Sequence, residues 1–141
     1  MKISDIVDIA ASGLSAQRAR MTVTASNLAN AESTRTAEGG PYRRRDVVFA
    51  ARPVGGGFRG EFDRALRSVE VERVVQDHRP PVSRYEPGHP DANSEGYVSL
   101  PHVEPVEEYA NMLSASRSFE ANLMVLHKVR EMANAALRIG R

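Results

Sequence analysis

Apolar and small residues recur at alternating steps of three and four near both ends of the chain, whereas the residues between them follow no such period. This spacing keeps one stripe of a helix facing a partner, so it predicts long helices over residues 3–29 and 105–139. The first stripe comprises Ile3, Val7, Ala10, Leu14, Gln17, Met21, Thr24 and Leu28. The second comprises Tyr109, Met112, Ser116, Phe119, Leu123, Leu126, Arg130, Ala133 and Leu137.

Local signals support both helices. Pro105 suits a first helical position, Glu107 and Glu108 favour the positive end of the helix dipole, and Gly140 follows as a stop. In the first helix, the small residues 10–13 permit close approach of a neighbouring backbone, and Asn27 and Asn30 are expected to terminate the helix through local side-chain hydrogen bonds. Two long helices on a short chain therefore favour packing against each other or against other chains.

The middle of the chain carries most of the glycine and proline and predicts short strands. Residues 69–75 alternate apolar and charged side chains, and residues 42–51, 82–85 and 97–100 are also expected to be extended. Gly55 to Gly57 mark a loop. The sequence predicts an α+β fold, with the N- and C-terminal helices packed as an antiparallel, coiled-coil-like pair and a small antiparallel β insertion between them.

Three segments follow from this division. Residues 1–33 form an N-terminal helical segment, residues 34–103 a β-rich insertion with loops, and residues 104–141 a C-terminal helical segment. The two helices are expected to form one core domain. A chain of 141 residues with 41% hydrophobic and 6% aromatic side chains can form a core, but not a large globular one.

Charge and cysteine content exclude several kinds of binding partner and site. The net charge of +1 gives no global attraction to nucleic acid or to a membrane, and the absence of cysteine excludes disulfides and thiolate metal sites. Residues 35–84 carry a net charge of +4 and residues 85–141 a net charge of −3, an asymmetry that favours head-to-tail contact between copies. Asp5 and Asp8 interrupt the apolar start, so neither a secretory signal peptide nor a membrane span is predicted.

Two patterns resemble metal sites. Asp91, Asn93 and Glu95, followed by Gly96, begin like a calcium loop, but His102 stands where a bidentate glutamate is needed, and an Asx-rich turn before a strand is the better interpretation. The four histidines, His78, His89, His102 and His127, include no close pair that would suit zinc. No metal and no cofactor is therefore predicted.

No catalytic site is predicted either. Arg43, Arg44 and Arg45 could touch phosphate, but a charged surface strand edge explains them better. No nucleophile and base are placed together by their spacing, so the chain is not expected to be an enzyme. The remaining feature is the pair of helical stripes, which either closes into an intramolecular hairpin or also contacts other chains. Because both stripes are wider than one partner requires, we expect intermolecular contact.

Longer motifs carry a resemblance to a known family. Ala25-Ser26-Asn27-Leu28-Ala29-Asn30 resembles the N-terminal signature of the bacterial flagellar rod, hook and hook-filament junction proteins. The stretch from Tyr85 to Asn122, with Pro105-Val106-Glu107-Glu108 inside it, resembles the proximal-rod members of that family in particular. The likeness covers nearly the whole chain, with one departure at Glu104, where the family often has Asn.

This resemblance implies a structural subunit of the basal-body proximal rod, the periplasm-crossing drive shaft that transmits torque. It implies helical hetero-assembly with other copies and other rod proteins, and passage through the flagellar type III export apparatus without a cleaved signal peptide. Neither nucleic acid nor membrane insertion is expected. The residues expected at the assembly interface are Ile3, Val7, Leu14, Met21, Asn27, Leu28, Asn30, Tyr109, Met112, Phe119, Leu123 and Leu126. The alternatives are a stand-alone helical adaptor with a β insertion and, more distantly, a calcium-dependent or catalytic module.

Overall fold

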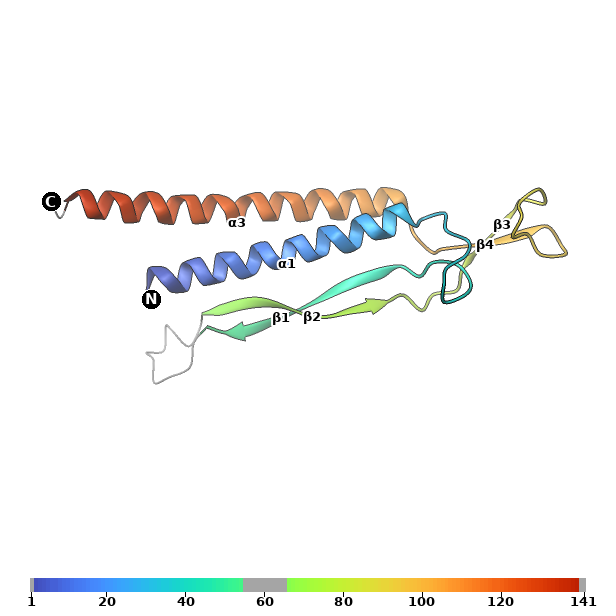
Figure 1. Ribbon diagram of the computed structural model, residues 1–141, viewed down its shortest axis with the longest axis horizontal. Coiled ribbons are helices and arrows are strands. Elements are labelled where there is room, and N and C mark those ends of the chain that lie inside the picture. Colours follow the sequence, from blue (N-terminus) through green and yellow to red (C-terminus); the bar gives the residue numbers. More distant parts are fainter. Residues whose placement is uncertain (1, 55–65, 140–141) are drawn as a thin grey trace.

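The computed structural model of the protein describes residues 2–54 and 66–139, and it confirms the α+β class. Its elements, in chain order, are α1 (Ile3–Ala29), β1 (Arg45–Pro53), β2 (Arg67–Gln76), β3 (Val82–Tyr85), β4 (Tyr97–Leu100) and α3 (Pro105–Ile139). Both helices have the predicted bounds and run antiparallel to each other (Figure 1). The loop predicted at Gly55 to Gly57 lies outside the described residues.

The ends of α1 follow from local hydrogen bonds. At its start the backbone N–H of Lys2 donates to the Asp5 carboxylate at 2.8 Å, which satisfies one of the N–H groups left over at a helix end. At its end the side-chain amide of Asn30 donates to the carbonyl of Ser26 at 2.8 Å. Asn30 therefore terminates the helix through a local contact, as predicted.

The β insertion consists of two separate two-stranded antiparallel sheets. In the first, β1 pairs with β2 from Arg45↔Gln76 to Pro53↔Arg67, with an irregularity between Val48 and Phe49. In the second, β3 pairs with β4 from Val82↔Leu100 to Tyr85↔Tyr97. The four predicted strands are present.

The first strand begins later than predicted, at Arg45 and not at Tyr42. The reason is that the backbone N–H of Tyr42 donates to Ser33 at 3.0 Å, back toward the end of α1. This contact turns the residues before Arg45 toward the helices, so they do not pair with β2.

The two helices and the β1–β2 hairpin form three layers, with α1 between α3 and the hairpin (Figure 1). The strands β3 and β4 extend from one end of these layers. The hydroxyl of Ser12 accepts a hydrogen bond from the backbone N–H of Val69 at 3.1 Å, and so ties β2 to α1. The helix α3 has 35 residues against 27 in α1, and its C-terminal end runs past the start of α1. Among the described residues, no helix is long and apolar enough to cross a membrane.

Small side chains bring the two helices together. Gly13 packs against Asn122, and a Cβ atom at Gly13 would lie only 2.9 Å from the Asn122 side-chain nitrogen. The residues buried along the helices include Ala10, Ala16 and Ala115. The predicted close approach at residues 10–13 is therefore present.

The polar hub and the candidate assembly interface

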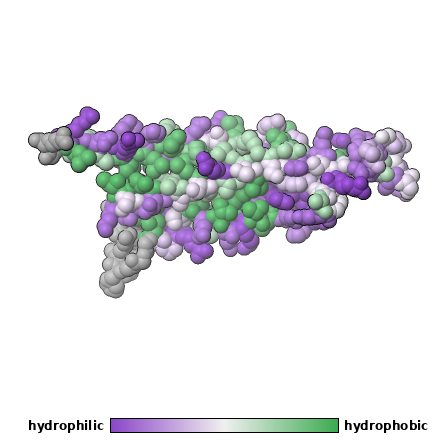
Figure 2. All heavy atoms as spheres, in the orientation of Figure 1, coloured by the Kyte–Doolittle hydropathy of each residue, from purple (hydrophilic) through white to green (hydrophobic). Residues whose placement is uncertain are grey.

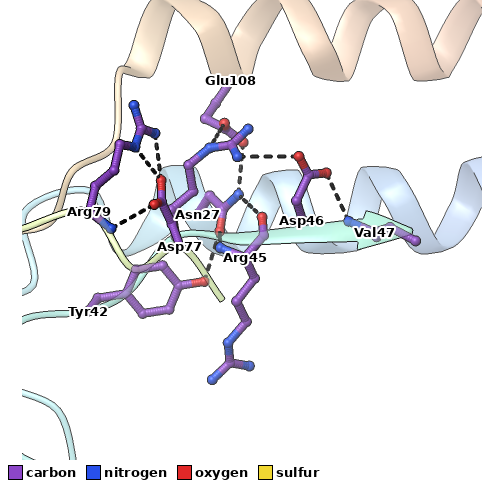
Figure 3. A network of polar contacts seen from close by, with 9 residues as sticks. Asn27, Tyr42, Arg45, Asp46, Val47, Asp77, Arg79 and Glu108 are labelled. Carbon is purple, nitrogen blue, oxygen red and sulfur yellow. Dashed lines mark hydrogen bonds and ion pairs between the residues drawn. The ribbon is translucent and has the colours of Figure 1, made fainter. Parts of the chain in front are cut away.

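Five residues from three distant parts of the chain meet where α1 ends and α3 begins (Figure 3). We call them the hub: Asn27, Tyr42, Arg44, Arg45 and Glu108. Asn27 and Glu108 are each only 1% exposed, and Tyr42 is also buried. Because a buried polar group without a partner is costly, the geometry of this cluster constrains the whole molecule.

Asn27 uses both ends of its side-chain amide. Its nitrogen donates to the carbonyl of Arg45 at 2.7 Å and to the carboxylate of Glu108 at 2.9 Å. Its oxygen accepts from the backbone N–H of Arg45 at 2.9 Å and from the hydroxyl of Tyr42 at 3.0 Å. Two donor hydrogens and two acceptor positions are thus all used, which saturates the hydrogen-bonding capacity of an asparagine amide.

The carboxylate of Glu108 is held by a second donor. Nε of Arg44 lies 2.7 Å from Oε1 of Glu108, and the Arg44 side chain is only 15% exposed. Burial disfavours the charged guanidinium, but the hydrogen bond and the charge of Glu108, joined by Asp46, outweigh burial and raise the pKa of Arg44 above its ordinary value. The Arg44 guanidinium therefore stays charged beside Glu108.

Two expectations from the sequence are corrected here. Asn27 was expected to make local hydrogen bonds at the end of its helix, but its partners lie 15 to 81 residues away. Arg44 was expected on a charged strand edge, but it lies before β1 and is drawn to the buried carboxylate. In both cases a buried charge from a distant helix outweighs the local preference.

A second ion pair flanks the hub. The carboxylate of Asp77 accepts from Nε of Arg79 at 2.6 Å and from its backbone N–H at 2.9 Å (Figure 3). The backbone N–H of Asp77 donates to the carbonyl of Arg44 at 2.8 Å. The side-chain and backbone hydrogen bonds from Arg79 lower the pKa of Asp77 to about 2. This pair anchors the end of β2 beside the segment that carries Arg44.

The residues expected at the assembly interface fall into three groups. Four are exposed: Ile3, Val7, Tyr109 and Leu123. Seven are half-buried: Leu14, Met21, Leu28, Asn30, Met112, Phe119 and Leu126. Asn27 alone is fully buried. Leu14 and Phe119 line one shallow surface groove between the two helices, together with Ala11, Ser15 and Arg18.

The inward face of α3 keeps part of the predicted stripe. Met112, Phe119 and Leu126 of that stripe are half-buried. The fully buried residues, Glu108, Ala115 and Val129, each lie one position before another predicted stripe residue. Only Ala115 among these is small, and Glu108 is a carboxylate held by hydrogen bonds from Asn27 and Arg44, so apolar periodicity alone does not mark these positions.

The structure shows an apolar surface that contains Tyr109 of the predicted stripe and three residues that the stripe did not include. We call it the outer stripe of α3: Val106 (81% exposed), Tyr109 (60%), Leu113 (55%) and Met124 (62%). These positions recur at helical spacing on the side away from the buried Glu108. Figure 2 shows apolar side chains gathered along the helical part of one face of the molecule.

The region that resembles a calcium loop is a turn. The side-chain oxygen of Asn93 accepts from the backbone N–H groups of Glu95 at 3.0 Å and Tyr97 at 2.9 Å, which confirms the predicted Asx-rich turn before a strand. Within residues 2–54 and 66–139, no group of three or more His, Asp or Glu side chains is placed to hold a metal ion.

Comparison with known families agrees with this picture at both ends of the chain. Residues 8–35 match the family described as "Flagella basal body rod protein". Residues 94–139 match the family described as "Flagellar basal body rod FlgEFG protein C-terminal". The two helices and the hub between them thus define a protein of the flagellar rod class, whose members are structural and not enzymatic.

Comparison with full-length relatives shows to which family within this class the chain belongs. The chain is 42% identical over 140 residues to the flagellar basal-body rod protein FlgC of Salmonella typhimurium, covering 99% of both chains. It is 39% identical to FlgC of Borreliella burgdorferi, over 99% of this chain and 98% of the relative, and 36% identical to FlgC of Bacillus subtilis, over 96% of each. The chain belongs to the FlgC family of flagellar basal-body rod proteins.

The hub predicts a large difference between two adjacent glutamates. Glu108→Ala leaves the buried amide of Asn27 and the guanidinium of Arg44 without their shared acceptor, so we expect a loss of about 3 kcal/mol in unfolding free energy. Glu107→Ala removes an exposed carboxylate from the same helical turn and is expected to cost about 0.5 kcal/mol. Thermal or urea unfolding of the full-length chain measures both, and equal losses would contradict the role assigned to Glu108.

The ion pair of Asp77 predicts a dependence on pH. Since the pKa of Asp77 is lowered from 3.8 to about 2 by folding, its contribution is fully present above pH 3.8 and is lost as the pH falls through about 2. The wild type should therefore unfold at a slightly higher temperature than Asp77→Asn at neutral pH, and the two should converge as the pH approaches 2. A temperature difference that stays constant across this range would show that the carboxylate charge contributes nothing.

Proposed function

We propose that the chain assembles helically, through its two terminal helices, into the proximal part of the flagellar rod, which crosses the periplasm and transmits torque. Its partners are other copies of the chain and other rod proteins. Residues 1–33 and 104–141 form the assembling core, and residues 34–103 are the insertion that the core carries. The flagellar type III apparatus exports the chain without removing a signal peptide, as in the family that it resembles.

The observation that carries this proposal is the outer stripe of α3. Leu113, Tyr109 and Val106 are not among the buried residues of the helix pair, and more than half of each is exposed. Exposed apolar residues that recur on one helix face indicate a surface that another chain covers. Each fully covered side chain of this size contributes about 1.5–3 kcal/mol.

Exposed residues of the stripes predicted from the sequence add to the outer stripe of α3 and extend the apolar surface around the pair of α1 and α3. Leu123, which is 41% exposed, and the exposed Ile3 and Val7 supply further apolar area. Leu14 and Phe119 line a groove at the junction of the two helices. A neighbouring helix that lies over this junction would cover residues of α1 and α3 together.

Helical assembly suits the shape of the chain. An elongated subunit whose contact surfaces on α1 and α3 differ binds its neighbours through unlike patches, and such contacts continue into a filament when the rotation does not close. Packed helices resist sliding because a displaced side chain meets an occupied position. These two properties together would give the rod its stiffness under torque.

Leu113→Asp tests the proposal. Aspartate at this exposed position leaves the contacts between α1 and α3 intact but places a charge where a neighbour would bind, so we expect export to continue while hook formation and motility are lost. Leu113→Met keeps an apolar side chain of similar volume and should remain motile.

Electron microscopy of isolated basal bodies and immunodetection of the exported chain measure these outcomes. A Leu113→Asp strain with wild-type numbers of hooks would remove the outer stripe from the interface. A stand-alone adaptor role would be favoured if deletion of the whole chain left hooks unaffected.

A further inference from the structure

We infer that the hub sets the register between the two terminal helices, so that it decides which residues of α1 lie opposite which residues of α3. This inference rests on the geometry of the hub and not on the proposed assembly. Its consequence for assembly is that every copy presents the same combined surface of α1 and α3 to its neighbours.

Apart from the hub, the helix contact is mostly non-directional. Its buried side chains include Ala10 and Ala16 on α1 and Ala115 and Val129 on α3, and apolar burial does not by itself select an alignment. Gly13 against Asn122 also favours the native alignment, because a slide by one helical turn, about 5.4 Å, would bring Ile9 or Gln17 to Asn122. The cysteine pairs described below replace Gly13 throughout, so they test the hub without this fit.

The hydrogen bonds of the hub are directional, and they occupy every donor and acceptor position of the Asn27 side-chain amide. A slide of one turn would carry the Glu108 carboxylate away from both Asn27 and Arg44, whose hydrogen bonds to it are 2.9 and 2.7 Å long. At 1% exposure, the carboxylate could not replace these donors with bulk water. A single buried polar contact that specifies register within an otherwise apolar helix pair is a known use of such groups in coiled coils.

Asn27 also positions the β1–β2 hairpin. Asn27 donates to the carbonyl of Arg45 and accepts from its N–H, so its amide pairs with the first residue of β1 as a neighbouring strand would. These two hydrogen bonds to Arg45 also orient the Asn27 amide so that its nitrogen faces Glu108. One side chain therefore sets both the alignment of α3 and the residue at which β1 begins. Arg45 additionally lies over the ring of Tyr42, with 5.8 Å between the guanidinium carbon and the ring centroid.

Disulfide trapping in cells that produce the full flagellar machinery tests this inference, because the chain has no native cysteine. A Cβ at position 13 lies 3.1 Å from Cγ of Asn122, the position that a cysteine sulfur would take, so Gly13→Cys with Asn122→Cys reports the native register. Gly13→Cys with Ser118→Cys, or with Leu126→Cys, reports a slide of one turn in either direction. Both of these pairs also carry Asn122→Ala to make room for the new side chain.

Each pair is placed once in the otherwise natural chain and once in a variant whose hub is apolar, Asn27→Leu with Arg44→Met and Glu108→Leu. With the hub intact, we expect the 13–122 cross-link to exceed each off-register cross-link at least tenfold. With the apolar hub, we expect the three yields to come within about threefold of one another and hooks to be lost.

Two results would overturn the inference. The first is an apolar-hub chain that still cross-links almost entirely at 13–122, which would show that the remaining helix contacts set the register. The second is an apolar-hub chain that cross-links at none of the three pairs, because the hub would then be needed to bring the helices together at all.

Discussion

The structure depends on one constraint, namely that a carboxylate removed from water needs donors in place. Glu108 meets this requirement through Asn27, near the end of α1, and through Arg44, just before β1. These contacts join residues 64 and 81 positions apart in the sequence. Three segments that local preferences would leave independent are therefore joined at one point, and the positions of α1, α3 and the β1–β2 hairpin follow from it.

The two helices approach each other closely and leave large apolar side chains uncovered. Gly13 makes room for Asn122, and Ala10, Ala16 and Ala115 are buried, whereas Leu113 and Tyr109 are more than half exposed. Such a pair buries little apolar surface by itself, and hydrophobic stabilisation scales with the buried area. The arrangement suits a subunit of the FlgC family, because the outward surface gains its stabilisation only when neighbours cover it.

The sequence predicted the elements well because their signals are local. The bounds of both helices follow from periodicity, from Pro105 at the start of α3 and from Asn30 at the end of α1. The hub could not be predicted in the same way, since nothing near Glu108 in the sequence distinguishes it from the exposed Glu107. Its partners are set by tertiary contacts, and the fully buried positions Glu108, Ala115 and Val129 lie one residue before predicted stripe positions, which apolar periodicity does not reveal.

The hub is inferred to align the helix pair, and neighbouring subunits are proposed to cover the outer stripe of α3. A density map of the isolated basal body, at a resolution that shows side chains, measures both parts at once. We expect Asn27 and Glu108 to remain within hydrogen-bonding distance in each copy, and Val106, Tyr109 and Leu113 to be buried against helices of adjacent subunits. A map in which the two helices of one copy are separated, or in which the outer stripe faces solvent, would contradict this expectation.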